Sequence, residues 1–134
     1  MPVPTATAFS TRPVASYAAF DRLYLKAIRY WVLLARAGRS PRQPLAALLG
    51  ERLAAQFCLL MEDCVSVWPD PFTTFPPCAC QCSPDEAALL GLLAHCDANA
   101  PEAAHAMLRD MLSPAARERL WDAAARCGAE RLGE

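Results

Sequence analysis

The sequence predicts an all-α protein, a small helical bundle, and three observations lead to this prediction. Apolar residues recur over long stretches at the three- and four-residue spacing of a buried helix face. At four places a capping residue closely precedes a proline and an apolar pattern, which marks a helix start because proline lacks the N–H that is unpaired in a first turn. We find no stretch of useful length that alternates apolar and polar residues as a half-buried strand does.

These signals define five helices. Two long helices, over residues 14–37 and 41–67, are expected to form an antiparallel hairpin. Three shorter helices, over residues 84–97, 101–111 and 114–127, are expected to cover it.

The first long helix divides into an apolar side and a water-facing side. The apolar side comprises Leu23, Ile28, Trp31, Val32 and Leu34. The side expected to face water comprises Asp21, Arg22, Lys26, Arg29 and Arg36.

Local signals also mark where helices begin and end. Ser83 and Glu86 have the spacing of a capping box, in which each side chain bonds the other residue's backbone N–H. Gly38 and Gly128 each follow a helical stretch that ends in arginine, and both are expected to be C-terminal caps.

The segment over residues 68–82, "WPDPFTTFPPCACQC", joins the second and third helices, and we call it the strap. Its four prolines exclude a helix and push each preceding residue toward extended geometry. Trp68, Phe72 and Phe75 are expected to pack the strap onto the bundle. Residues 1–12 are expected to form a flexible tail, and residues 13–134 a single helical domain.

Composition limits the class of protein. Of 134 residues, 54% are hydrophobic and 20% are charged, which excludes a disordered polyampholyte. The apolar runs fall short of the roughly 20 residues that a membrane span needs, and the N-terminus lacks a signal-peptide pattern. We therefore expect a cytoplasmic protein that does not enter a membrane. Seven cysteines are an odd number, so in a reducing compartment these thiols would stay free or bind metal.

Three cysteines stand at every second position of the strap. In an extended segment Cys78, Cys80 and Cys82 would point the same way, and soft thiolates select zinc, copper or iron–sulfur centres. A tetrahedral zinc site needs a fourth ligand, and Cys64 at the end of the second helix is the best candidate. Cys96 would lie about 20 Å along the third helix from Cys82, too far to join them. The leading hypothesis is a metal-binding protein, with zinc ahead of iron–sulfur or copper.

Two other functions remain open. The strap cysteines are also consistent with a thiol redox factor, or with unspecialised reduced thiols. Alternatively, the protein is an interaction module, because residues 1–67 hold eight basic and four acidic residues, whereas residues 68–134 hold five and ten. In that case Arg22, Arg29 and Arg36 would meet an acidic protein partner, and a homodimer is also open.

Other functions are disfavoured. Nucleic-acid binding is not expected, since the three C-terminal helices that could mimic a DNA-binding motif belong to the acidic half. The chain has no Gly-rich phosphate loop, HExxH motif or local cysteine-nucleophile signature, so we expect a protein that is not an enzyme.

Three stretches carry a family resemblance: "LKAIRYWVLLARAG", "RQPLAALLGERLA" and "PPCACQCSPDEAALLGLL". In layout the chain resembles an uncharacterised family of small alphaproteobacterial proteins, a domain of unknown function, in which a P-C-x-C segment precedes a similar helix start. The resemblance spans roughly residues 20 to 125. It implies a bacterial origin and no particular activity.

Overall fold

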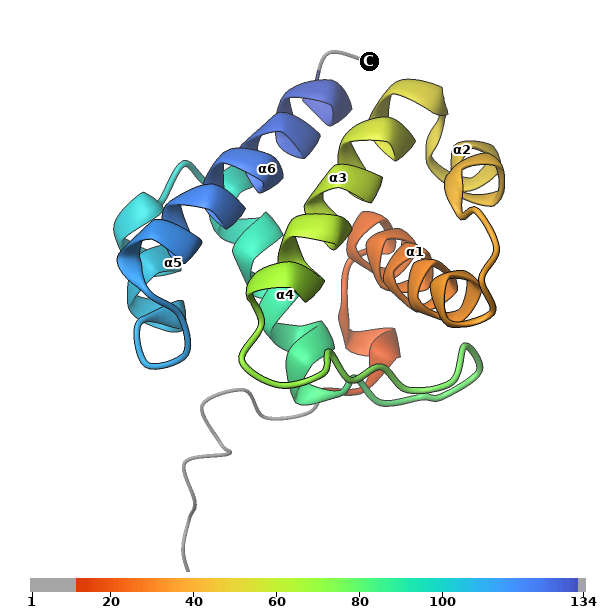
Figure 1. Ribbon diagram of the computed structural model, residues 1–134, viewed down its shortest axis with the longest axis horizontal. Coiled ribbons are helices and arrows are strands. Elements are labelled where there is room, and N and C mark those ends of the chain that lie inside the picture. The colour runs from red at the N-terminus through yellow and green to blue at the C-terminus, as the bar shows by residue number, and fades with distance from the viewer. Residues whose placement is uncertain (1–11, 133–134) are drawn as a thin grey trace, which may run out of the picture.

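The computed structural model describes residues 12–132, and the regular structure in that range is helical apart from one isolated antiparallel bridge between Pro13 and Gln81 (Figure 1). A short 3-10 helix, η2 (Val14–Ser16), precedes six α-helices. These are α1 (Ala19–Arg36), α2 (Arg42–Leu49), α3 (Glu51–Val67), α4 (Pro84–Asp97), α5 (Pro101–Leu108) and α6 (Pro114–Leu132). The predicted all-α bundle is confirmed.

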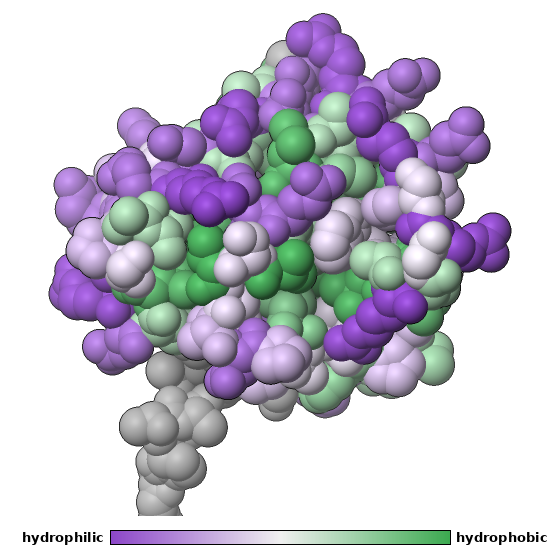
Figure 2. Space-filling model, viewed as in Figure 1, coloured by the Kyte–Doolittle hydropathy of each residue, from purple (hydrophilic) through white to green (hydrophobic). Residues whose placement is uncertain are grey.

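Helix α3 runs through the middle of the bundle, between α6 and α1 (Figure 1). Its most extensive contact is with α6, and α4 packs against α6 and α5. In the core, Tyr24 of α1 stacks on Phe57 of α3 with ring centroids 5.7 Å apart. On the face that carries α3 and α6, hydrophobic side chains reach the surface between hydrophilic ones (Figure 2), and the large exposed ones on α3 are Leu59 and Val65.

The second predicted helix is two helices in the structure. Gly50 lies between α2 and α3 with φ 87° and ψ 156°, a backbone conformation that L side chains rarely adopt. The chain turns there, and α2 packs against both α1 and α3. The prediction of one helix over residues 41–67 was therefore wrong, because the apolar spacing continues through the turn.

The first predicted helix begins later than expected. Tyr17 and Ala18 have extended backbone dihedrals and separate η2 from α1. The N–H of Val14 is bonded to the carbonyl of Cys80 in the strap, at 2.6 Å, so this end of the chain is held by the strap instead of continuing the helix.

The two predicted glycine caps have different outcomes. Gly38 follows α1 with φ 70°, as a C-terminal cap should. Gly128 instead lies inside α6 and is buried, so that prediction was wrong. A Cβ atom at Gly128 would lie 3.2 Å from Oδ1 of Asp97, so the glycine permits α6 to pass close to the end of α4.

The strap contains no helix, crosses one end of the bundle and reverses at a turn over Pro77 and Cys78 (Figure 1), so the expectation that the three strap cysteines share one extended segment was wrong. Trp68 and Phe72 are buried and meet edge-to-face with ring centroids 5.1 Å apart, whereas Phe75 is half-buried. The aromatic residues therefore pack the strap onto the helices, as predicted.

Among the helices of residues 12–132, none is both long and apolar enough to cross a bilayer.

Candidate functional site

Arg29 is the residue around which the strap is organised. Its side chain is only 3% exposed and pairs with Glu86 of α4, which is 0% exposed. Nε of Arg29 donates to Oε2 of Glu86 at 2.9 Å, and Nη2 donates to Oε1 at 3.1 Å, so the pair is bidentate. The prediction that Arg29 faces water was wrong, because a charged side chain can be buried when a carboxylate pairs with it.

The same guanidinium also binds the backbone of residues 77–82, which we call the cysteine segment. It donates to the carbonyls of Ala79 at 3.0 Å and Gln81 at 2.7 Å, and more loosely to that of Pro77 at 3.4 Å. In a planar trans peptide the next residue's N–H points opposite to the carbonyl. The N–H groups of Cys78 and Cys80 therefore face away from Arg29.

Glu86 continues this network into the strap and the start of α4. It accepts hydrogen bonds from the N–H of Ser83 at 2.8 Å and of Phe75 at 3.0 Å. The N–H of Glu86 donates to Oγ of Ser83 at 3.0 Å, which completes the predicted capping box. Oγ of Ser83 in turn donates to the carbonyl of Thr73 at 2.7 Å. A single buried carboxylate thus joins α1, the strap and α4.

The N-terminal segment holds the other edge of the cysteine segment. Besides the Val14–Cys80 bond, the N–H of Cys82 donates to the carbonyl of Arg12 at 3.0 Å. These two bonds flank the bridge between Pro13 and Gln81. Residues 1–11 of the predicted tail lie outside the described residues, and Arg12 is bound to the strap.

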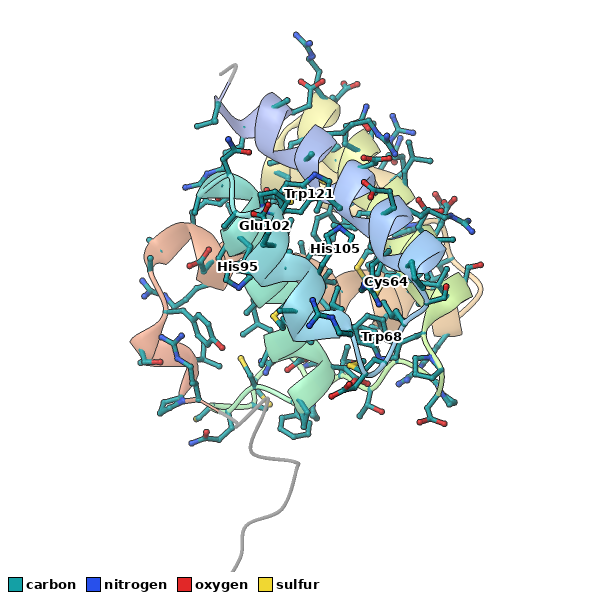
Figure 3. All side chains as sticks on the ribbon, turned by 90° about the vertical axis from the view of Figure 1, so that its left-hand side faces the viewer. Cys64, Trp68, His95, Glu102, His105 and Trp121 are labelled. Atoms are coloured by element: carbon teal, nitrogen blue, oxygen red, sulfur yellow. The ribbon has the colours of Figure 1, made fainter. Side chains whose placement is uncertain are left out.

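The four predicted metal ligands occupy different environments. Cys78 and Cys80 are exposed, whereas Cys82 and Cys64 are buried. Burial raises the pKa of the Cys64 thiol, and Figure 3 shows Cys64 inside the bundle near Trp68. Burial also raises the pKa of the Cys82 thiol, opposed by a hydrogen bond with Tyr17. Within residues 12–132, no three His, Cys, Asp or Glu side chains are grouped so that they could hold a metal ion.

The remaining cysteines and the histidines lie elsewhere. Cys58 and Cys127 are buried in the core. Cys96 is half-buried, and its thiol donates to the carbonyl of Trp121 at 3.8 Å. His105 accepts a hydrogen bond from Nε of Arg117 at 3.2 Å, and Figure 3 places His95 and His105 on the part of the bundle built from α4 and α5.

A groove of about 800 Å³ is lined by α1, the cysteine segment and residues 13–15. One wall is the exposed face of α1, with Arg22, Lys26 and Tyr30, and the opposite wall is the loop that carries Cys78 and Cys80. Pro13 to Ala15 close one side. The groove and the two exposed thiols together form the candidate functional site.

Sequence reasoning missed two features of this site. The Ser83–Glu86 capping box identified Glu86 as a helix-start residue, but nothing local indicated that the carboxylate also binds Arg29. Tyr17 was read as part of a helix, whereas burial beside Cys82 raises its pKa to about 12. Both features depend on contacts between segments that are distant in the sequence.

Comparison with known proteins does not place the chain in a family. No family model matches it, and neither the curated proteins nor the solved structures include a match. The resemblance drawn from the strap and its neighbouring helices therefore stays a prediction.

Proposed function

We propose that this protein binds a thiophilic metal ion without catalysing a reaction, and that Cys78 and Cys80 supply the ligands. The observation that carries the proposal is that Arg29 holds the backbone of the cysteine segment in place. A buried arginine commits its guanidinium to three loop carbonyls and a carboxylate. This arrangement fixes the backbone of a short segment whose two thiols remain exposed.

The environments of the cysteines favour monovalent copper over zinc. Zinc takes four protein ligands in a structural site, and two of the four predicted ones, Cys64 and Cys82, are buried. Both would have to leave packed positions to reach a common ion. Monovalent copper is a soft ion suited to thiolates and is satisfied by two of them, so Cys78 and Cys80 suffice without rearrangement of the core.

The test is an anaerobic titration of the reduced, untagged protein with Cu(I) in competition with a chromophoric chelator. We expect about one Cu(I) ion per chain, because one pair of exposed thiols is present. The variant C78S/C80S should lose this binding. The variant C96S is the matched control, since Cys96 lies on α4 and contacts Trp121, and it should bind as the wild type does. Equal copper uptake by wild type and C78S/C80S would refute the proposal.

The same titration with Zn²⁺ tests the full ligand set predicted from the sequence. Alkylation followed by mass spectrometry would count the thiols that the ion protects. Protection of Cys78 and Cys80 alone supports the two-thiol site. Protection that extends to Cys64 and Cys82 would instead support a four-cysteine zinc site that assembles only when metal binds.

A redox role for the same two thiols is the competing function. Incubation with oxidised glutathione would then join the two sulfur atoms, and the two protons and two electrons that they lose would reduce the glutathione disulfide to two thiols. Loss of two alkylatable thiols and of two hydrogens from the chain mass, at a rate well above that of Cys96, would favour this alternative.

A further inference from the structure

The groove beside the cysteine segment has positive charge along the face of α1. Arg22 and Lys26 are exposed one turn apart on that face. Arg22 donates one hydrogen bond to the carbonyl of Tyr17, and Lys26 lies over the ring of Tyr30 with Nζ 6.0 Å from the ring centroid. Neither side chain has an ion-pair partner among residues 12–132.

The negative groups nearby do not compensate this charge. No Asp or Glu side chain of the described residues 12–132 lines the groove. Arg29 forms part of the floor, and its charge is matched by Glu86 inside the protein. The two remaining cations therefore give the groove an uncompensated positive potential, which attracts an anionic occupant.

The rest of the lining is largely apolar. Tyr30 on the α1 wall and Val14 at the closed side are half-buried, and the loop wall adds Pro77 and Ala79. An occupant that fits must therefore carry both carboxylates and an apolar side chain. The volume of about 800 Å³ and the open mouth suit several residues of extended polypeptide better than a single small carboxylate.

From this charge and lining we infer that the groove binds a short acidic segment of a partner protein. The carboxylates of the segment pair with Arg22 and Lys26, and one apolar side chain rests on the half-buried Tyr30 and Val14. Arg29 acts indirectly, because it holds the loop that forms the second wall. This assignment replaces the set of Arg22, Arg29 and Arg36, since Arg29 is buried in an internal ion pair.

The test is selection from a library of random displayed peptides on the immobilised full-length protein, with sequencing of the enriched pool. We expect enrichment of peptides that combine Asp or Glu with an apolar residue. By fluorescence anisotropy, the Kd of an enriched peptide should weaken about tenfold or more in R22Q/K26Q, and it should also weaken with added salt.

Matched variants distinguish the effect of the groove cations from that of positive charge elsewhere on the protein. R109Q/R126Q removes two exposed arginines outside the groove and should leave the Kd within about twofold of wild type. Arg22 also bonds the carbonyl of Tyr17, so its replacement could disturb the local backbone. The single variant K26E controls for this effect, because it leaves Arg22 in place, and it should weaken binding on its own.

Three results would overturn the inference. The first is an absence of enriched acidic peptides, and the second is binding that R22Q/K26Q leaves unchanged. The third is concentration-dependent self-association that K26E abolishes, which would make a second copy of this chain the occupant. The inference does not depend on metal binding, because the peptide Kd is measured on metal-free protein and should be the same order of magnitude whether or not the Cu(I) titration shows binding.

Discussion

At the scale of single residues, the buried pair of Arg29 and Glu86 determines the shape of the strap. Burying two charges costs several kcal/mol of desolvation per ion, which their attraction only roughly offsets. The pair therefore adds little net stability compared with two apolar residues. Its effect is geometric, because five hydrogen bonds from one guanidinium place the loop backbone at defined distances from α1 and α4.

Removing one member of this pair should be costly. We expect Arg29→Met to lower the free energy of unfolding by about 3–5 kcal/mol, because it leaves the Glu86 carboxylate buried without its partner. Urea denaturation monitored by circular dichroism measures this change.

Two variants control that experiment. Arg39→Met changes an exposed arginine and should stay within about 0.5 kcal/mol of wild type. The double variant R29M/E86L should recover part of the loss, because no charge is then left buried. A loss of less than about 1 kcal/mol in R29M would show that water reaches Glu86 and that the pair behaves like a surface one.

At the scale of helices, the break at Gly50 allows α2 to turn away from α3 and cover α1. The apolar stripe of residues 45–64 is continuous in sequence, yet Leu45 and Leu49 pack from α2 while Leu53 and Phe57 pack from α3. A helix that continued past Gly50 would carry the first part of the stripe away from α1. The glycine thus converts one long amphipathic pattern into two packing faces.

The variant G50A tests this break. Alanine is strained at φ 87° and ψ 156°, so we expect a loss of about 1–3 kcal/mol in the free energy of unfolding. Gly38→Ala is the comparison, since Gly38 has φ 70° and no atom within 4 Å of an added Cβ, and its cost should be about 1–2 kcal/mol. A G50A protein that is more stable and more helical than wild type would show that a continuous helix packs equally well.

At the scale of the whole molecule, buried thiols make stability depend on pH. Burial raises the pKa of Cys127 to about 12 and that of Cys96 to about 12. An unfolded thiol titrates near pH 8.5, roughly its free value. Below that pH both states are protonated and the stabilisation is complete. Above it the unfolded chain ionises while the folded chain does not, so stability falls as pH rises.

We therefore expect the melting temperature to fall between about pH 8.5 and 10.5 in the presence of a reductant. Cys127, which is 0% exposed, should contribute a slope of up to about 1.4 kcal/mol per pH unit. Cys127→Ala should reduce the slope, whatever its effect on stability at neutral pH. Differential scanning calorimetry across this range measures both slopes, and an equal slope in the two proteins would contradict the assignment.

Features that depend on neighbouring residues could be predicted from the sequence. The all-α class, the start of α4 at the Ser83–Glu86 capping box and the non-helical strap were all predicted correctly. Helical periodicity, side-chain capping and proline geometry act over a few residues, so a single chain is enough to read them.

The candidate site, in contrast, depends on contacts between distant segments. Arg29 has the sequence surroundings of a water-facing residue, and its burial depends on Glu86, 57 residues away, and on strap carbonyls 48 to 52 residues away. The different exposures of Cys78 and Cys82 likewise depend on Arg12 and Tyr17, which lie more than 60 residues earlier in the sequence. A buried polar side chain needs a hydrogen-bonding partner. Where that partner lies depends on tertiary packing and cannot be read from the neighbouring residues.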